Sequence, residues 1–183
     1  MSDQMIAGLV RAYVAFGANL GNPFAAFVRA SEALAALPDT RFAARSSCYR
    51  SEPLGVAGKQ PDYINAVIAL DTGLAPQALL DALLAIEAAG GRTRAATLAP
   101  RPIDLDLLLY GDTVLRTPAL TLPHPRLHRR AFVLLPLAEI APGLVIPGIG
   151  ALAPLLETVR GQRIARVEDA HAPTRGFAKP ALA

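Results

Sequence analysis

The spacing of apolar and polar residues divides the chain into short strands and amphipathic helices. Short apolar runs bounded by turn formers predict strands at 12–17, 42–50, 63–71 and 103–110, with an extended return at 113–122. Apolar residues that recur every three or four positions predict helices at 23–37, from Pro76 to the glycine pair at 90–91, and at 151–160. Residues 126–141 predict short helical turns.

The first helix has clear boundary signals. Asn22 is a good N-cap and Pro23 a good first helical residue, whereas Pro38 and Asp39 end the helix. The resulting order, strand–helix–strand–strand–helix–strand, is that of the ferredoxin-like arrangement. We therefore predict an α+β fold, in which one antiparallel sheet carries flanking helices and two long loops at 51–62 and 90–101 connect the elements.

Length and composition are those of one globular domain. The chain has 183 residues, of which 52% are hydrophobic and 18% charged, which is typical of a folded rather than a disordered chain. We predict a single domain at 1–160 and a loosely ordered C-terminal tail at 161–183. Cys48 is the only cysteine, which excludes a disulfide within the chain and fits a reducing cytosol.

Residues 132–156 form an apolar stretch long enough to span a bilayer. Four prolines and Glu139 interrupt it, and proline removes helical hydrogen bonds that lipid cannot replace. We therefore predict a short helix, a turn and a buried loop here, without membrane contact. The first residues lack the basic segment of a secretory signal and have only a short apolar run, so we expect a cytoplasmic protein.

Two acidic residues interrupt the apolar strand at 103–110. Asp104 and Asp106 point to one face, because side chains alternate along a strand, and their Cα atoms lie roughly 6.5 Å apart. At an effective dielectric constant near 20, two such charges repel by roughly 2–3 kcal/mol. Arginine salt bridges or a solvated sheet face would compensate this repulsion. A divalent metal would also do so, because Mg²⁺ takes one or two carboxylates together with water and phosphate oxygens.

Basic residues gather around this acidic pair. Residues 91–130 hold seven arginines against three aspartates, a net charge of +4, whereas the whole chain carries +3, so the rest carries −1. Because arginine binds phosphate oxygens well, the cluster favours a site for Mg²⁺ and a polyphosphate. The alternative is that these arginines only keep a surface soluble.

A second polar pair interrupts the predicted strand at 63–71. Tyr63 and Asn65 share a face of this strand. An asparagine offers a donor and an acceptor, and a tyrosine offers a ring and a hydroxyl group. Such a pair can bind a flat heterocycle with a mixed hydrogen-bonding edge, although a half-buried polar pair at the start of a strand fits the pattern equally well.

Five motifs together carry a family resemblance: FGANLGNP, SSCYRSEPLG, QPDYINAVIAL, APRPIDLDLLLYG and LPHPRLHRRAFVLLPLAEIAP. Through them, residues 13–147 resemble the 6-hydroxymethyl-7,8-dihydropterin pyrophosphokinase family of folate biosynthesis. The resemblance implies transfer of a pyrophosphoryl group from ATP to the pterin hydroxymethyl oxygen, with release of AMP. It also implies a monomer that acts on small molecules, without nucleic acid or membrane partners.

The resemblance assigns roles to individual residues. Asp104 and Asp106 would hold two Mg²⁺ ions, and Arg92 and Arg101 would be catalytic arginines that contact the phosphates. The implied ATP-binding residues are Glu87, Arg94, Leu107, Thr121, His124 and Arg130. The implied pterin-binding residues are Ser51, Leu54, Gly55, Tyr63, Asn65 and Phe132. The two long loops would close over the substrates and exclude water.

The chain departs from some family members near the site. Leu98 stands where such members have an aromatic residue, the loop around it is one residue shorter, and Pro125 follows His124 where others have tyrosine. These changes affect loop closure and affinity more than the type of reaction. Two rival functions remain: another Mg²⁺-dependent nucleotidyl- or phosphotransferase on the same fold, and an RNA-binding module, which needs aromatic residues on its central strands.

Overall fold

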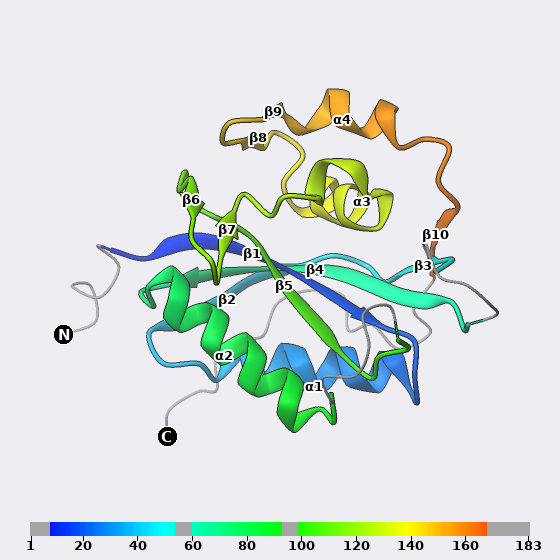
Figure 1. The fold of residues 1–183 in the computed structure, drawn as a ribbon, viewed down its shortest axis with the longest axis horizontal. Coiled ribbons are helices and arrows are strands. Elements are labelled where there is room, and N and C mark those ends of the chain that lie inside the picture. Colours follow the sequence, from blue (N-terminus) through cyan, green and yellow to red (C-terminus); the bar gives the residue numbers. More distant parts are fainter. Residues whose placement is uncertain (1–7, 54–59, 93–98, 168–183) are drawn as a thin grey trace, which may run out of the picture.

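The computed structural model describes residues 8–53, 60–92 and 99–167 (Figure 1). The main sheet contains β1 (Val10–Ala18), β2 (Thr40–Arg45), β3 (Tyr49–Ser51), β4 (Tyr63–Thr72), β5 (Asp104–Tyr110) and β10 (Ile164–Arg166). The helices are α1 (Pro23–Ala35), α2 (Pro76–Ala89), α3 (Ala131–Ile140) and α4 (Leu152–Thr158), with a 3-10 turn, η1 (Leu127–Arg129), before α3. Two small ribbons are formed by β6 (Leu115–Arg116) with β7 (Thr121–Leu122), and by β8 (Val145–Ile146) with β9 (Gly150–Ala151).

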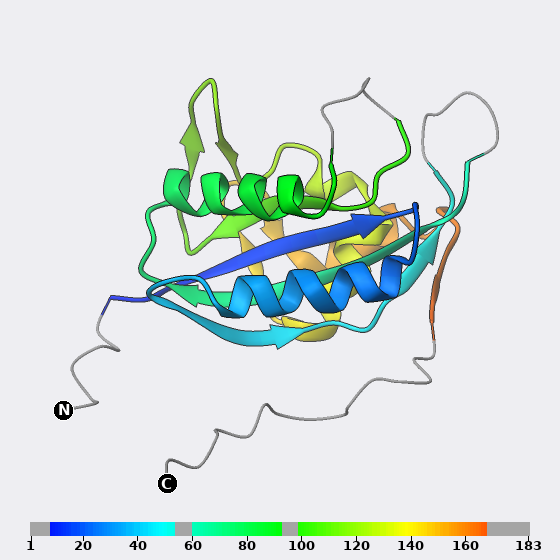
Figure 2. The ribbon, with the colours of Figure 1, turned by 90° about the horizontal axis from the view of Figure 1, so that it is seen from below.

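The strand order confirms the predicted ferredoxin-like fold. The sheet runs β10-β3-β4-β1-β5, with β2 also paired to β4, and the pairs that β1 makes with β4 and β5 are antiparallel. α1 and α2 lie across one face of the sheet, and α3 and α4 lie over the other (Figures 1 and 2). β5, which carries the two aspartates, is therefore the edge strand beside β1.

The two predicted helices of the core begin where the sequence places their signals. In α1, the side chain of Asn22 accepts a hydrogen bond from the amide of Ala25 at 3.1 Å, and Pro23 is the first helical residue. α1 ends at Ala35, earlier than the predicted residue 37, and Asp39 turns the chain with a positive φ of 48°. α2 spans Pro76–Ala89, as the proline and the glycine pair predict.

The sheet separates two hydrophobic clusters. β4 contributes to both, because consecutive residues such as Val67 and Ile68 point to opposite faces, and both are fully buried. The first cluster packs α1 and α2 against the sheet and includes Cys48, the single cysteine of the sequence, which is 1% exposed. The second cluster lies under α3 and α4. Burial on both faces explains why β4 has a nearly continuous apolar sequence.

Two predicted elements differ in kind from those in the structure. The strand predicted at 42–50 is two strands, because at 46–48 the chain leaves the β2 register: the hydroxyl of Ser46 accepts a hydrogen bond from the Val67 amide. The turns predicted at 126–141 include a ten-residue helix, α3, which continues through Pro136. That proline is buried, so packing outweighs its missing hydrogen bond.

The C-terminal segment also differs from its prediction. Ile164–Arg166 forms strand β10, which pairs with β3 at the edge of the sheet, so the predicted tail contributes to the fold in its first residues. Residues 168–183 of that predicted tail lie outside the described residues. Within the described part of the chain, no helix is long and apolar enough to cross a membrane, because the apolar stretch at 132–156 is divided among α3, a small ribbon and α4.

Candidate active site

The candidate site occupies the part of one sheet face that α3 leaves open. Under α3, this face carries buried residues of the second cluster, Tyr13, Val67 and Leu108. Beyond α3 the same alternating positions become small or polar and line a pocket. They are Ala15 and Gly17 on β1, Tyr63 and Asn65 on β4, and Asp104 and Asp106 on β5.

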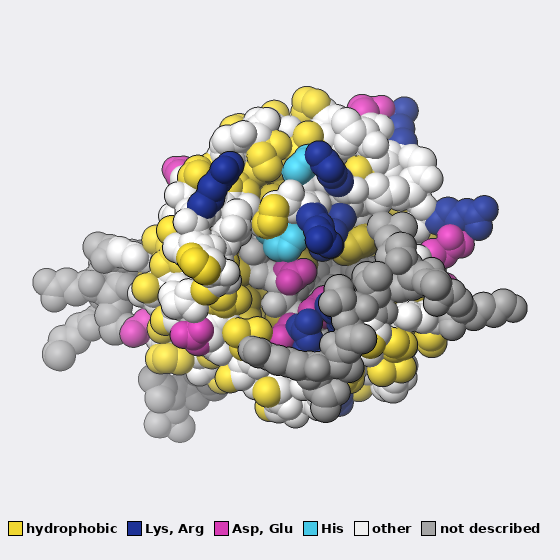
Figure 3. Space-filling view, in the orientation of Figure 1, with side chains coloured by type: hydrophobic (Ala, Val, Ile, Leu, Met, Phe, Trp, Pro, Cys, Tyr) yellow, Lys and Arg dark blue, Asp and Glu magenta, His cyan; other side chains and the backbone are white. Residues whose placement is uncertain are grey.

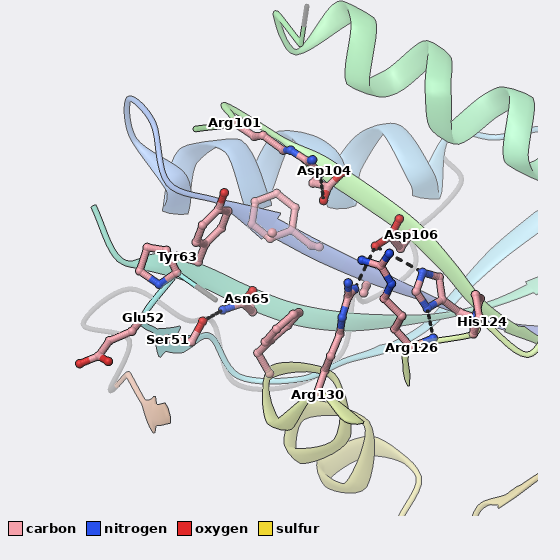
Figure 4. Close-up of a pocket in the computed structure, with 16 residues that line it drawn as sticks. Ser51, Glu52, Tyr63, Asn65, Arg101, Asp104, Asp106, His124, Arg126 and Arg130 are labelled. Carbon is pink, nitrogen blue, oxygen red and sulfur yellow. Dashed lines mark hydrogen bonds and ion pairs between the residues drawn. The ribbon is translucent and has the colours of Figure 1, made fainter. Parts of the chain in front are cut away.

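This pocket has a volume of about 450 Å³, which is the size of a site for a small organic ligand. Its remaining lining residues are Phe16, Ser51, Glu52, Pro53, Arg101, His124, Pro125, Arg126, Arg130 and Phe132. Figure 4 shows that Asp106, His124 and Arg130 point toward one another and that Arg101 lies beside Asp104, whereas Glu52 points away from them. In the space-filling view, acidic groups lie between basic groups and histidine on this face (Figure 3).

The two aspartates have different partners. A carboxylate oxygen of Asp104 lies 2.6 Å from Nη1 of Arg92, and the other lies 2.7 Å from Nη1 of Arg101. Among the described residues, the ion-pair contacts of Asp106 are longer, at 3.9 Å to Nε2 of His124 and to Nη1 of Arg130. The arginine partners that the sequence allows as compensation are therefore present, and they are much closer to Asp104.

The pKa of Asp106 is raised above its usual value. Burial is the main cause, and the negative charge of Asp104 acts in the same direction. The nearby guanidinium groups of Arg130 and Arg92 oppose this shift but do not cancel it. A cation beside Asp106 would favour its ionised form. The acidic pair is therefore suited to bind positive charge.

His124 faces Asp106 as a neutral ring. The backbone N–H of Arg126 donates a hydrogen bond to Nδ1 of His124 at 3.2 Å, which makes Nδ1 the acceptor and Nε2 the protonated nitrogen. Burial lowers the pKa of His124, and the nearby charges of Arg130 and Arg126 lower it further, against the attraction of Asp106. The ring therefore presents an N–H donor to the pocket at neutral pH (Figure 4).

Glu87 lies beneath the acidic pair, at the end of α2. It is 3% exposed and accepts a hydrogen bond from the Leu105 amide at 2.6 Å. It also pairs with Arg92, which thus lies between the carboxylates of Glu87 and Asp104. Burial raises the pKa of Glu87, whereas the Leu105 amide and Arg92 favour its ionised form. This arrangement ties α2 to β5 directly below the pocket.

The opposite end of the pocket is less charged. The side-chain amide of Asn65 donates to the hydroxyl of Ser51 at 2.9 Å and to the carbonyl of Tyr49 at 3.3 Å, which joins β4 to β3. Phe132 lies at the start of α3 with the guanidinium of Arg130 5.4 Å from its ring centre. Burial raises the pKa of Tyr63, so its phenol stays protonated. A flat ring could contact these groups.

Asn19 joins the segments on either side of the pocket. It is 3% exposed at the end of β1, and its side-chain oxygen accepts from the Arg101 amide at 2.8 Å. Its side-chain nitrogen donates to the Pro61 carbonyl at 3.2 Å and to Gln60 at 3.4 Å. One side chain therefore connects the end of the 51–62 loop to the end of the 90–101 loop.

The structure brings most of the predicted site residues together. Ser51, Tyr63, Asn65, Arg101, Asp104, Asp106, His124, Arg130 and Phe132 all line the pocket. Arg92 and Glu87 lie next to it through Asp104. Leu107 is buried in the first cluster and Thr121 is on β7, so neither side chain lines the pocket. Leu54, Gly55, Arg94 and Leu98 lie outside the described residues.

Sequence reasoning missed several lining residues. Glu52, Pro53 and Arg126 line the pocket without an assigned role, although Arg126 belongs to the basic cluster visible in the sequence. Ala15 and Gly17 form the pocket floor on β1. The sequence does contain a pattern that indicates this floor, namely two small residues at alternate positions of a strand. Only small side chains leave room for a ligand above a sheet.

Comparisons with known proteins find one matching family and several relatives. The family described as 7,8-dihydro-6-hydroxymethylpterin-pyrophosphokinase matches residues 13–142. A 2-amino-4-hydroxy-6-hydroxymethyldihydropteridine pyrophosphokinase of Pseudomonas aeruginosa is 47% identical over 160 residues, covering 87% of this chain and 98% of that protein. One of Haemophilus influenzae is 42% identical over 149 residues, covering 81% and 92%.

A structural comparison supports the fold alone. A crystal structure of Plasmodium falciparum HPPK-DHPS superposes with a TM-score of 0.62 over 86% of this chain, at 12% sequence identity. This chain spans 47% of the length of that protein. The shared architecture at so low an identity indicates that the ferredoxin-like core tolerates wide sequence change.

Proposed function

The chain belongs to the 7,8-dihydro-6-hydroxymethylpterin-pyrophosphokinase family, and from that premise we propose how its residues carry out the reaction. The enzyme transfers the pyrophosphoryl group of ATP to the hydroxymethyl group of 6-hydroxymethyl-7,8-dihydropterin and releases AMP, in folate biosynthesis. The observation that carries the residue assignment is one pocket with two chemically distinct ends. Acids and arginines lie at one end, and Tyr63, Asn65 and Phe132 lie at the other.

The reaction defines what the pocket has to align. A bond forms between the hydroxymethyl oxygen and the β-phosphorus of ATP, and the bond from the β-phosphorus to the bridging oxygen of the α-phosphate breaks. AMP leaves with that oxygen, and the hydroxyl proton is lost to the surroundings. Such transfers depend on in-line positioning and on stabilisation of phosphate charge, so no covalent intermediate with the enzyme is needed.

Asp104 and Asp106 fit magnesium. Their carboxylates lie on one face of β5 and both line the pocket, and oxygen ligands of this kind suit Mg²⁺. Among the described residues, no group of three or more His, Cys, Asp or Glu side chains is placed to hold a metal ion, so phosphate oxygens and water would complete the coordination. We assign two Mg²⁺ ions to the pair; when bound, they would offset the triphosphate charge.

The basic residues would bind the triphosphate. Arg101 and Arg130 line the pocket, and Arg92 adjoins it through Asp104. Guanidinium groups held this way by carboxylates are oriented before the substrate arrives, which favours stabilisation of charge in the transition state. His124 would add its Nε2–H as a neutral donor to a phosphate oxygen, because Nδ1 already accepts from Arg126.

The less charged end would bind the pterin. Phe132 offers an aromatic face for stacking, and Asn65 and Tyr63 offer polar groups to the edge of the heterocycle. The hydrogen bond from Asn65 to Ser51 fixes the orientation of that amide. This end adjoins Asp104 and Asp106 in the same pocket, so the hydroxymethyl group would face the phosphates.

We also propose that the enzyme works as a monomer in the cytoplasm with small molecules as its only substrates. The single buried cysteine supports a reducing compartment. Light scattering after size-exclusion chromatography tests the oligomeric state, and a mass twice that of the chain would contradict the proposal.

The test is AMP release from ATP and Mg²⁺, with and without 6-hydroxymethyl-7,8-dihydropterin. Pterin-dependent AMP together with an equal amount of pterin pyrophosphate is the expected result. AMP formation at the same rate without the pterin would favour the alternative function, another Mg²⁺-dependent nucleotidyl- or phosphotransferase. No observation on this chain supports that alternative.

Substitutions at the acidic pair test the metal assignment. Asp106→Asn should lower turnover by on the order of 100-fold or more, because metal stabilisation of transition-state charge is worth several kcal/mol. Asp71→Asn is the matched control, since Asp71 pairs with Arg11 on the surface and lies outside the pocket lining. Near-normal turnover of the Asp106 variant would overturn the assignment.

A further inference from the structure

Gln162 lies beyond residues 13–142, which the family model matches, yet its side chain reaches the wall of the active site. We propose that Gln162 is a positioning residue: its side-chain amide holds the backbone on both sides of Arg130 and thereby orients Arg130 and Phe132 toward the substrates. This inference rests on the proposed roles of those two residues.

The contact is made from both ends of one amide group. Oε1 of Gln162 accepts a hydrogen bond from the backbone N–H of Ala131 at 2.9 Å. Nε2 of Gln162 donates to the backbone carbonyl of Arg129 at 2.8 Å. These two backbone groups flank Arg130, so the side chain of Gln162 pairs with the chain there as a neighbouring strand would.

Helix α3 needs such a partner. The N–H groups in the first turn of a helix have no partner within the helix, and a side chain at the N-cap commonly accepts from one of them. The N-cap of α3 is Arg130, whose side chain makes no capping hydrogen bond. Gln162 supplies the missing acceptor from a distant part of the chain, which leaves the side chain of Arg130 available to the pocket.

Arg130 and Phe132 both depend on this turn. Nη1 of Arg130 lies 3.9 Å from Asp106, and its guanidinium carbon lies 5.4 Å from the centre of the Phe132 ring. Both side chains line the pocket. A shift of the backbone at 129–131 would therefore move a proposed phosphate ligand and the proposed pterin-stacking ring together.

The segment that carries Gln162 is itself fixed to the site. The next residues form β10, in which Ile164 pairs with Ser51 of β3. Ser51, Phe132 and Gln162 also line one small cavity behind the pocket. Gln162 is thus attached on one side to β3 and on the other to α3, and both elements contribute pterin-side residues.

The first test replaces Gln162 with methionine, which keeps the length of the side chain and removes both hydrogen bonds. Gln77→Met is the matched control, because Gln77 is an exposed glutamine on α2 whose side-chain amide donates to Asp81. Steady-state kcat and KM for each substrate are measured at 25 °C, with thermal unfolding recorded in parallel.

We expect Gln162→Met to lower kcat/KM for the pterin by roughly tenfold, because two oriented hydrogen bonds are lost, and Gln77→Met to leave it within about twofold. A lower melting temperature with unchanged kcat and KM values for Gln162→Met would overturn the inference, since Gln162 would then only stabilise the fold. Absence of pterin-dependent turnover in the wild-type enzyme would instead refute the proposed function.

A second test asks whether Gln162 acts through Arg130. Gln162→Met is measured in the wild type and in an Arg130→Ala background, and the two effects on kcat/KM are compared. If Gln162 orients Arg130, its substitution should cost much less in the Arg130→Ala background, because coupled residues are not additive. Equal effects in the two backgrounds would contradict the inference.

Discussion

Asn19 gives a prediction whose size follows from its hydrogen bonds. Asn19→Ala removes the acceptor of the Arg101 amide and the donor to the Pro61 carbonyl. Each net hydrogen bond is worth about 1 kcal/mol, and a buried N–H left without a partner costs about 1–3 kcal/mol. We therefore expect the free energy of unfolding to fall by about 2–4 kcal/mol. For a chain of this size, that corresponds to a melting temperature lower by roughly 4–16 °C.

The same substitution should affect both substrates. Asn19 connects the end of the 51–62 loop, next to Tyr63, with the end of the 90–101 loop, next to Asp104. Loss of this connection should raise KM for the pterin and KM for ATP together, because each loop end is adjacent to groups of one half-site. Differential scanning fluorimetry and steady-state kinetics measure the two effects.

Asn22→Ala is the matched control for this experiment. Asn22 caps α1 through one exposed hydrogen bond to the Ala25 amide, so its loss should cost about 1 kcal/mol without a change in either KM. The reasoning on Asn19 would be refuted if Asn19→Ala lowered the melting temperature no more than Asn22→Ala. It would also be refuted if only one KM changed.

Three further predictions concern the pocket and the residues beneath it. Glu87→Gln keeps an acceptor for the Leu105 amide, so in urea unfolding it should be about 1–3 kcal/mol more stable than Glu87→Leu, which leaves that amide unpaired. The raised pKa of Asp106 means that the folded state binds this proton more tightly than the unfolded state. Without Mg²⁺, Asp106→Asn should therefore gain stability over wild type as the pH rises through that pKa, and a gain independent of pH would contradict this. Gly17→Ala should retain activity, because its Cβ would lie 3.5 Å from Asn65 Oδ1, which is an ordinary contact. Gly17→Leu should instead fill the pocket and abolish pterin-dependent AMP release, while the melting temperature stays near that of wild type.

The sequence predicts best what depends on neighbouring residues. Asn22 and Pro23 start α1 as expected, and strand alternation places Asp104 and Asp106 on one face. The interruption between β2 and β3 and the continuation of α3 through Pro136 depend instead on contacts with β4 and with the sheet. Such contacts join residues far apart in the chain, so periodicity and turn signals do not contain them.

The same limit applies to the site. Alternation and charge clustering suffice to find the acidic pair and its basic surroundings. They do not reveal that Arg92 is shared by Glu87 and Asp104, or that Asn19 connects two loop ends. From the sequence, repulsion between the two carboxylates is the main feature of the acidic pair. In the structure, the charge of Asp104 is already compensated by two close arginines. Pairing of this kind is set by the fold, which brings 87, 92 and 104 together.

The pocket floor and the pocket wall should differ in hydrogen exchange. The floor lies on β1, where Ala15 and Gly17 have neighbours in both β4 and β5, so their amides should exchange only when the whole sheet opens. In the wall at 129–132, the Ala131 amide is instead bonded to a side chain, that of Gln162, which lies next to the edge strand β10. In mild denaturant, the amides of the wall should therefore exchange by local opening while those of the floor stay protected. Substrate binding should then be lost before the chain unfolds.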